Sequence, residues 1–260
     1  MSIASPACRD AVIGRVGARS EATTNMPKYI EELVSQQIRR SELARKREID
    51  AGLPCPTPVV TISRTMGSGA RIIARKLAQD LGWSLWDREL LDAIAQDAEV
   101  SQRVVEAFDE KAVSEIELLA RSALGDYESA GFLYAKHLAK AVAAVAKLGN
   151  AVILGRGANF LLPDALSIRI DASFEHRVQN MMTYENLTRQ QAEAKLKASD
   201  KERQEFLVRM FGKERVERAH YDLSIWMDRF STDDAVEIIK TTVRVWCARQ
   251  RSRQPAAEKA

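Results

Sequence analysis

The sequence contains few of the residues that build metal centres and disulfide frameworks. Its 260 residues include three cysteines, Cys8, Cys55 and Cys247, and three histidines, all far apart. Scattered cysteines in odd number are typical of a reducing compartment, and neither residue type shows metal-ligand spacing. We therefore expect no structural zinc and no disulfide framework, and we expect a cytoplasmic protein.

Long apolar runs and charge of one sign are also missing. No apolar run approaches the roughly 20 residues that are needed to span a bilayer. The 39 Lys and Arg residues face 36 Asp and Glu, which leaves a net charge of only +3. This falls short of the concentrated basic surface that is typical of a dedicated nucleic-acid binder. Neither a membrane nor a nucleic acid is therefore an expected partner, whereas 46% hydrophobic residues can form a sizeable core.

The N-terminal part divides into a tail, a helix and a linker. Residues 1–26 lack the apolar core of a secretory signal, and we expect them to be disordered. Two other interpretations of this segment are possible: a transit peptide, or a true start of the protein at Met26. Apolar residues at helical spacing predict an amphipathic helix over 27–52, whose charged face over 28–50 is either solvated or a surface for self-association or partner docking. Prolines in 53–58 cannot continue this helix and mark a boundary.

Beyond that boundary, short β-branched and apolar runs alternate with helical patterns. We expect strands at 59–63, 83–86, 151–154, 166–170 and 221–226. We expect helices at 71–81, 88–97, 102–124, 129–148, 174–185, 188–211 and 232–249. Strands that alternate with helices predict parallel pairing with crossovers, and hence an α/β fold with helices on both faces of the sheet.

A glycine-rich turn joins the first strand to the first helix of this part. Gly67 and Gly69 allow backbone N–H groups to wrap around an anion, and the helix N-terminus adds positive charge. Phosphate is the expected guest, with a plain tight turn as the alternative. The rule G-x-x-x-x-G-K-S/T fails at Arg64, Ala70 and Ile72. A dinucleotide fingerprint fails at Ile72 as well, so NAD binding stays a minor alternative.

Several stretches together resemble the cytidylate kinase-like family, a branch of the P-loop nucleoside monophosphate kinases. They are Ile62-Ser63-Arg64-Thr65-Met66-Gly67-Ser68-Gly69-Ala70-Arg71, Leu85-Trp86-Asp87-Arg88-Glu89-Leu90-Leu91, Ala151-Val152-Ile153-Leu154-Gly155-Arg156-Gly157-Ala158-Asn159, Asp171-Ala172-Ser173 and Tyr221-Asp222-Leu223. They occur in the family's order and cover most of the chain from Val59 to about Lys240.

The resemblance implies a P-loop NTPase-like three-layer sandwich with a central parallel sheet. The kinase-like domain would span 59–250, with a helical acceptor-side insertion at about 88–148 and a helical lid at about 188–219. Residues 251–260 would form a disordered tail. ATP and Mg²⁺ would be the cofactors, and CMP or dCMP would be the first-choice phosphoryl acceptor.

The resemblance also implies roles for single residues. Donor phosphates would lie against Arg64, Gly67, Ser68, Gly69, Ala70 and Arg71, and the acceptor against Asp87, Arg88, Gly155, Arg156 and Gly157. Arg203 and Arg209 would belong to the lid; Arg71, Arg156 and Arg203 would act in catalysis; Ser68 and Asp87 would be metal ligands. Simple helix pairing of Arg203 and Arg209 and a helix N-cap at Asp87 are the structural alternatives. Since Ala70 and Ile72 replace the usual lysine and hydroxyl, a catalytically impaired nucleotide-binding regulatory or assembly protein is the alternative function.

Overall fold

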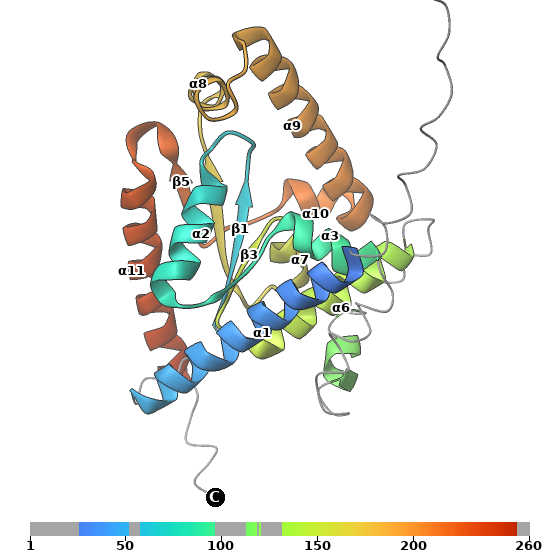
Figure 1. Cartoon of the computed structure of the whole chain (residues 1–260), viewed down its shortest axis with the longest axis vertical. Helices are drawn as coiled ribbons and strands as arrows, with labels where there is room; N and C mark the ends of the chain where they lie inside the picture. The colour runs from blue at the N-terminus through green and yellow to red at the C-terminus, as the bar shows by residue number, and fades with distance from the viewer. Residues whose placement is uncertain (1–25, 52–57, 97–112, 119, 121–131, 254–260) are drawn as a thin grey trace, which may run out of the picture.

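A computed structural model describes residues 26–51, 58–96, 113–118, 120 and 132–253. Five strands form one sheet in the order β2-β3-β1-β4-β5, and every neighbouring pair is parallel. The strands are β1 (Val59–Arg64), β2 (Ser84–Trp86), β3 (Ala151–Leu154), β4 (Leu166–Asp171) and β5 (Leu223–Trp226). This sheet, with β1 in its centre (Figure 1), confirms the predicted α/β class.

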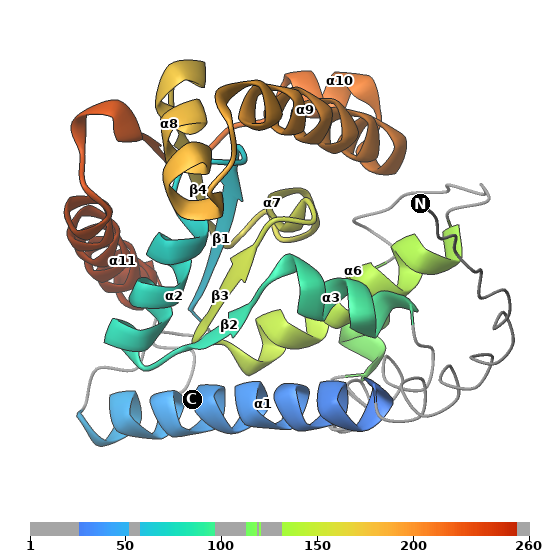
Figure 2. The same ribbon diagram turned by 45° about the horizontal axis from the view of Figure 1, so that its top comes forward.

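Side chains alternate between the two faces of the sheet, so each strand contributes to two cores. In β3, Val152 and Leu154 pack in one core, while Ala151 and Ile153 pack in the other. The first core contains α2 (Ala70–Leu81) and α11 (Thr232–Arg253), and the second contains α3 (Arg88–Gln96) and α6 (Phe132–Leu148). These helix pairs lie on opposite sides of the strands (Figure 2), which gives the expected three layers.

The N-terminal amphipathic helix α1 (Met26–Asp50) packs on the same domain. Its Gln37 Oε1 accepts a hydrogen bond of 2.9 Å from the Leu85 N–H of edge strand β2, and Ser41 and Ser84 share one of 2.8 Å. An uncovered strand edge is a template for pairing with another chain. The helix α1 therefore covers the β2 edge with polar groups and leaves its charged side exposed.

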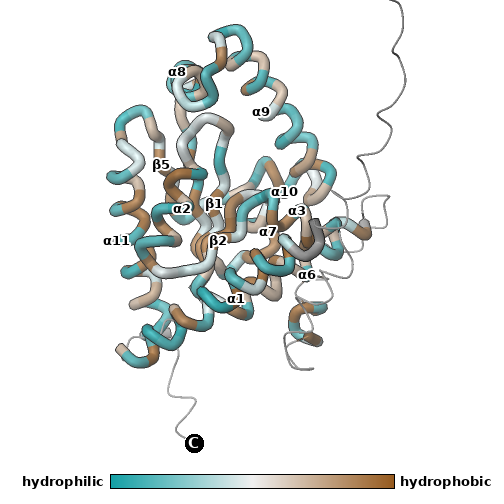
Figure 3. The backbone as a smooth tube through the Cα atoms, viewed as in Figure 1, coloured by the Kyte–Doolittle hydropathy of each residue, from teal (hydrophilic) through white to brown (hydrophobic). Residues whose placement is uncertain are grey.

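A helical hairpin stands above the carboxyl ends of the strands (Figure 1). Helices α8 (Phe174–Glu185) and α9 (Arg189–Phe211) enclose a small third core, and α10 (Lys213–Glu217) follows. Thr188 caps α9 through a capping box with Gln191. Hydrophilic residues prevail along α9, in contrast to the hydrophobic segments gathered around the sheet (Figure 3). The hairpin thus occupies the place expected of a lid.

Some elements differ from the sequence prediction. Strand β5 begins at Leu223 because the Asp222 carboxylate accepts a hydrogen bond of 2.7 Å from Ser167 N–H. The short helices α7 (Ala158–Leu161), α10 and η1 (Met227–Arg229) are too brief to show periodicity. Helix α11 extends to Arg253, three residues into the expected tail.

Other predictions are corrected or lie outside the described residues. Cys247 is disulfide-bonded, so scattered cysteine spacing does not exclude a disulfide. Four parts of the sequence prediction lie outside the described residues. They are residues 1–25 of the expected N-terminal tail, most of the proline-rich linker, much of the acceptor-side insertion between 97 and 131, and residues 254–260. No helix in the described ranges is long and apolar enough to cross a membrane.

Candidate functional site

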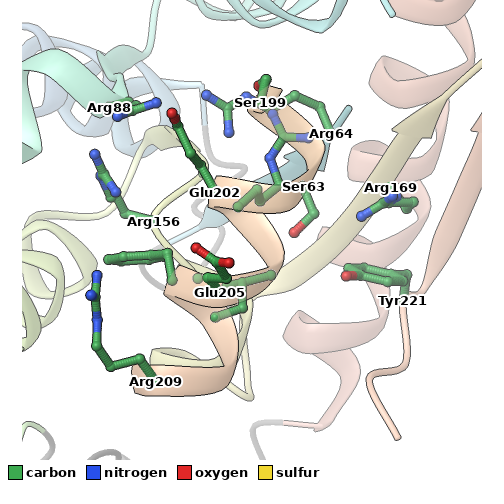
Figure 4. Close-up of a pocket in the computed structure, with 15 residues that line it drawn as sticks. Ser63, Arg64, Arg88, Arg156, Arg169, Ser199, Glu202, Glu205, Arg209 and Tyr221 are labelled. Carbon is green, nitrogen blue, oxygen red and sulfur yellow. The ribbon is translucent and has the colours of Figure 1, made fainter. Parts of the chain in front are cut away.

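A cavity of about 260 Å³ lies where β1 and β3 end and α9 passes over them (Figure 4). Its lining comes from the sheet, from α3 and from the lid helix. The lining residues are Ser63, Arg64, Arg88, Gly155, Arg156, Gly157, Arg169, Ser199, Glu202, Arg203, Glu205, Phe206, Leu207, Arg209 and Tyr221. Ligands of open α/β sheets bind outside the carboxyl ends of the strands, where the strand order reverses. The strand order reverses at β1, because the chain continues from β3 on one side of β1 to β4 on the other side.

The cavity is strongly cationic. Six arginines face two glutamates in its lining, and the arginines surround the opening in Figure 4. A guanidinium presents a planar fork of N–H donors that matches phosphate and carboxylate oxygens. The lining therefore favours a multiply charged anion.

Arg64 is a partly buried cation of the cavity. Burial, and then the charges of Arg203 and Arg88, lower its pKa from the ordinary arginine value to about 10, which leaves it protonated at neutral pH. No carboxylate of the described residues forms a salt bridge with it. The guanidinium rests against Gly155, where a Cβ would lie 2.5 Å from Arg64 Nη1. Only glycine at position 155 leaves room for this arrangement.

Arg156 is held in a constrained geometry between two glycines. Its φ of 52° lies in the left-handed region, which costs a non-glycine residue free energy. Its side chain is only 12% exposed, forms a salt bridge with Asp92 and lies 4.7 Å over the ring centroid of Phe206. Gly155, Arg156 and Gly157, which the sequence analysis assigns to the acceptor, thus all line one cavity.

Arg203 and Arg209, from α9, also line this cavity. Burial lowers the pKa of Arg203, and Asp200, 3.6 Å away, only partly offsets this effect. Arg88, from α3, reaches the cavity as well and lies 3.6 Å from Asp92. The structure thus brings together Arg64, Arg88, Arg156, Arg203 and Arg209 from four separate segments.

The glycine loop, residues 65–71, lies beside the cavity and contributes none of its lining. Gly67 and Gly69 both have φ of 79°, which agrees with the expected need for glycine. Among the described residues, no hydrogen-bond acceptor faces the N–H groups of Gly67, Gly69, Ala70 and Arg71. These free amides at the start of α2 form a second anion-binding feature next to the first.

Three residues that the sequence analysis assigns to the site, Ser68, Arg71 and Asp87, do not line the cavity. Ser68 is 1% exposed and its hydroxyl donates a 2.8 Å hydrogen bond to the Thr65 carbonyl, so it is turned inward. Arg71 is 57% exposed and pairs with Asp87 at 3.2 Å and Glu89 at 3.0 Å, outside the cavity. Asp87 also accepts a 3.1 Å hydrogen bond from Leu90 N–H, which is the N-cap alternative.

This placement does not assemble a metal site from Ser68 and Asp87, because the internal hydrogen bond and the ion pair occupy their oxygens. The described residues also contain no cluster of three or more His, Cys, Asp or Glu that could hold an ion. Mg²⁺ is usually bound through few protein ligands together with substrate phosphates. A metal at this site would therefore depend chiefly on a phosphate ligand.

Sequence reasoning missed several residues around the site. Arg169 lines the cavity from β4, and Asp171 accepts hydrogen bonds from Arg169 Nη2 (2.8 Å) and Thr65 Oγ1 (2.6 Å). Burial alone would raise the pKa of Asp171, but these bonds leave it below 3.8. The N-cap of α8 is Ser173, two residues after Asp171. The signal was the polar Arg169 between two core residues of one strand.

A further missed residue, Arg177 on α8, joins the lid to the glycine loop. It is 7% exposed. Its Nη1 donates to the Met66 carbonyl at 3.4 Å and to both Asp200 oxygens at 2.9 and 3.0 Å. Nearby, Asn180 Nδ2 donates to the Gly67 carbonyl at 2.8 Å. The loop, α8 and α9 are thus connected through one buried cation.

Two crystal structures are among the solved structures that match this chain. One is of an uncharacterized protein from Eubacterium ventriosum ATCC 27560, with 22% identity, coverage of 72% of this chain and 98% of that chain, and a TM-score of 0.47. The other is of TT1252 from Thermus thermophilus, with 18% identity, coverage of 72% and 96%, and a TM-score of 0.36.

A comparison with curated proteins finds no match. The model of the cytidylate kinase-like family matches residues 59–229, from the first residue of β1 to the end of η1. This range contains the sheet, the glycine loop, the arginine cavity and the lid hairpin, and it is more than half of the chain. The chain therefore belongs to the cytidylate kinase-like family.

Proposed function

We propose that this protein is an ATP-dependent phosphotransferase of the nucleoside monophosphate kinase type, with CMP or dCMP as the first-choice acceptor. The observation that carries the proposal is the partly buried Arg64 guanidinium, which forms no salt bridge within the described residues and lies among other arginines at the carboxyl end of β1. A partly buried cation without a carboxylate partner is costly for the protein to maintain. An anionic ligand would remove that cost, so the site favours phosphate binding.

The acceptor phosphate would lie between Arg64 and Arg203. Arg156, held by Asp92 and Phe206, would donate from the side of β3. Ligand pockets for drug-sized molecules range from about 300 to 1,000 Å³, and this cavity of about 260 Å³ suits a mononucleotide better than a dinucleotide. The cavity size thus supports a small phosphorylated acceptor.

The donor phosphates of Mg·ATP would lie on the free amides of the glycine loop. ATP supplies the γ-phosphoryl group. Arg71 would have to leave Asp87 and Glu89 to assist, and exposed ion pairs contribute only about 0–1 kcal/mol. A triphosphate can therefore compete for Arg71 at little cost.

The contribution of the chain's own residues would be positioning and positive charge. Phosphoryl transfer needs in-line placement and stabilisation of charge on the equatorial oxygens. Arg64 and Arg156 would orient the acceptor from the sheet, and Arg203 would approach from the lid. The α9 side chains over the cavity, including Phe206, would exclude water from the transferring group.

The alternative function is a catalytically impaired nucleotide-binding regulatory or assembly protein. It is favoured by Ala70 in place of the bridging lysine and by the position of Arg71 outside the cavity. The apolar side of α1 is already packed on its own domain. A partner of α1 would therefore have to bind its exposed outer side, where Leu43 and Ile49 are exposed beside the charged residues.

An assay of ADP release across a panel of nucleoside monophosphates separates the two functions. We expect CMP-dependent turnover that falls about 10²–10³-fold in Arg156→Ala, since removal of one donor to transition-state charge has this magnitude, and that also falls in Arg71→Ala. Arg75→Ala, at an exposed position on α2, is the matched control and should retain turnover. Saturable ATP binding without turnover on any acceptor would contradict the kinase proposal and favour the regulator.

A further inference from the structure

The carboxylate of Asp92 on α3 connects three parts of the molecule behind the cavity. Its Oδ1 accepts a 2.6 Å hydrogen bond from the Tyr134 hydroxyl of α6. Its Oδ2 forms the salt bridge with Arg156 and lies 3.6 Å from Arg88 Nε. Asp92 itself does not line the cavity, whereas both arginines do.

The Arg156 side chain depends on this carboxylate for its position. Its guanidinium is fixed between Asp92 on one side and the Phe206 ring on the other. Its Nε is buried and has no hydrogen-bond partner in the described part of the chain. A buried donor without a partner is costly, so the contacts with Asp92 and Phe206 hold the guanidinium in place against that cost. The remaining N–H groups of Arg156 can reach an anion only while Asp92 holds the guanidinium in place.

Tyr134 fixes Asp92 in turn. Burial and the hydrogen bond to Asp92 raise the pKa of the Tyr134 phenol, so the hydroxyl remains a donor at neutral pH. This bond joins α6 to α3, two helices of the predicted acceptor-side insertion. The orientation of Asp92 is thus set by a residue that is farther still from the cavity.

We propose that Asp92, fixed by Tyr134, is a positioning residue that holds Arg156 and Arg88 for the acceptor phosphate and thereby determines acceptor affinity. This inference rests on the proposed function, in which the cavity binds the acceptor. Asp92 does not line the cavity and acts only through Arg156 and Arg88. Its effect is therefore on the acceptor alone. The donor loop, residues 65–71, does not contact Asp92, and donor affinity is independent of it.

The test measures CMP and Mg·ATP binding separately by calorimetry, together with the KM of each in the ADP-release assay. Asp92→Asn keeps the size of the side chain and removes its charge, and Tyr134→Phe removes one hydroxyl. We expect CMP affinity to fall about 10–100-fold in Asp92→Asn and about 3–10-fold in Tyr134→Phe, because hydrogen bonds to charged groups have this strength. Mg·ATP affinity should stay within about twofold, and Asp92→Glu should recover part of the CMP affinity.

Two controls separate positioning from general loss of structure. Gln96→Ala changes an exposed residue of α3, and Tyr184→Phe removes a hydroxyl from an exposed tyrosine on α8; both should bind CMP as the wild type does. Equal weakening of CMP and Mg·ATP in Asp92→Asn would indicate a merely structural role and overturn the inference. Unchanged CMP affinity in both Asp92→Asn and Tyr134→Phe would overturn it as well.

Failure of the proposed function has a different signature. If the wild type binds no nucleoside monophosphate, the kinase proposal fails, and inorganic phosphate becomes the probe. Thermal protection by phosphate that is lost in Asp92→Asn and retained in Gln96→Ala would still support the positioning role. Protection that is equal in the two variants, or absent in the wild type, would overturn it.

Discussion

Replacement of Arg64 by methionine should stabilise the protein in the absence of ligand and weaken anion binding in the arginine cavity. Burial and the neighbouring arginines lower the pKa of Arg64 from the ordinary arginine value to about 10, and a tenfold change in an acid constant corresponds to about 1.4 kcal/mol. The charge therefore costs the folded state up to about 3 kcal/mol. The side chain is partly accessible to water, which screens part of this cost, and we take about 1–2 kcal/mol as the expected gain.

The gain is measurable by thermal and urea denaturation. For a domain of this size, 1–2 kcal/mol corresponds to a rise in Tm of about 2–8 °C. Methionine is flexible and apolar, so it can fill the space of the arginine stem. In the same samples, inorganic phosphate should protect the wild type more than Arg64→Met, which retains the free amides of the glycine loop.

The control for this experiment is Arg75→Met, at an exposed position on α2, which should change stability by less than about 0.5 kcal/mol. A loss of more than about 1 kcal/mol in Arg64→Met, together with unchanged protection by phosphate, would refute the reasoning. That result would mean that Arg64 is a satisfied structural cation and that anions bind elsewhere.

Three further predictions concern the framework of the site. In Gly157→Ala a Cβ would lie 2.2 Å from Phe211 Cε2, so urea denaturation should show a loss of about 2–4 kcal/mol. Gly212→Ala, with φ of 79° and open space, should lose only about 1 kcal/mol, and equal losses would contradict the packing argument. The lowered pKa of Asp171 means that its carboxylate stabilises the fold above about pH 4 and that this contribution disappears as the pH falls through the folded pKa. The stability advantage of the wild type over Asp171→Asn should therefore shrink between pH 5 and pH 2, and an advantage that stays constant with pH would exclude this role. Asp200→Asn leaves the buried Arg177 without its carboxylate and should cost about 1–3 kcal/mol, whereas Glu214→Gln, in an exposed pair with Arg218, should cost almost nothing; equal costs would contradict the anchoring role of Arg177.

The sheet was predictable because its strands carry strong local signals. The run Ala151–Leu154 is apolar and is fully buried in the structure, and Val59–Arg64 is β-branched and bounded by proline and glycine. Arg156 could be singled out since it lies between two glycines directly after a buried strand. Such a position places a side chain at the carboxyl end of the sheet in any parallel arrangement.

Asp92 could not be identified in the same way. On a short amphipathic helix it is indistinguishable from a solvated carboxylate, and only the packing of α3 on α6 brings Tyr134 within hydrogen-bond distance. The same limit applies to Arg64, directly before the glycine loop, and to Arg71, its last residue. Nothing in their spacing shows that Arg64 turns toward Gly155 while Arg71 turns outward to Asp87 and Glu89.

The central claim is that the arginine cavity binds the phosphate of the acceptor nucleotide. A crystal structure of the protein with CMP bound tests it most directly. The account predicts the CMP phosphate within hydrogen-bond distance of Arg64 and Arg203. A CMP phosphate bound away from both guanidinium groups, or a cavity that stays empty at saturating CMP, would contradict it.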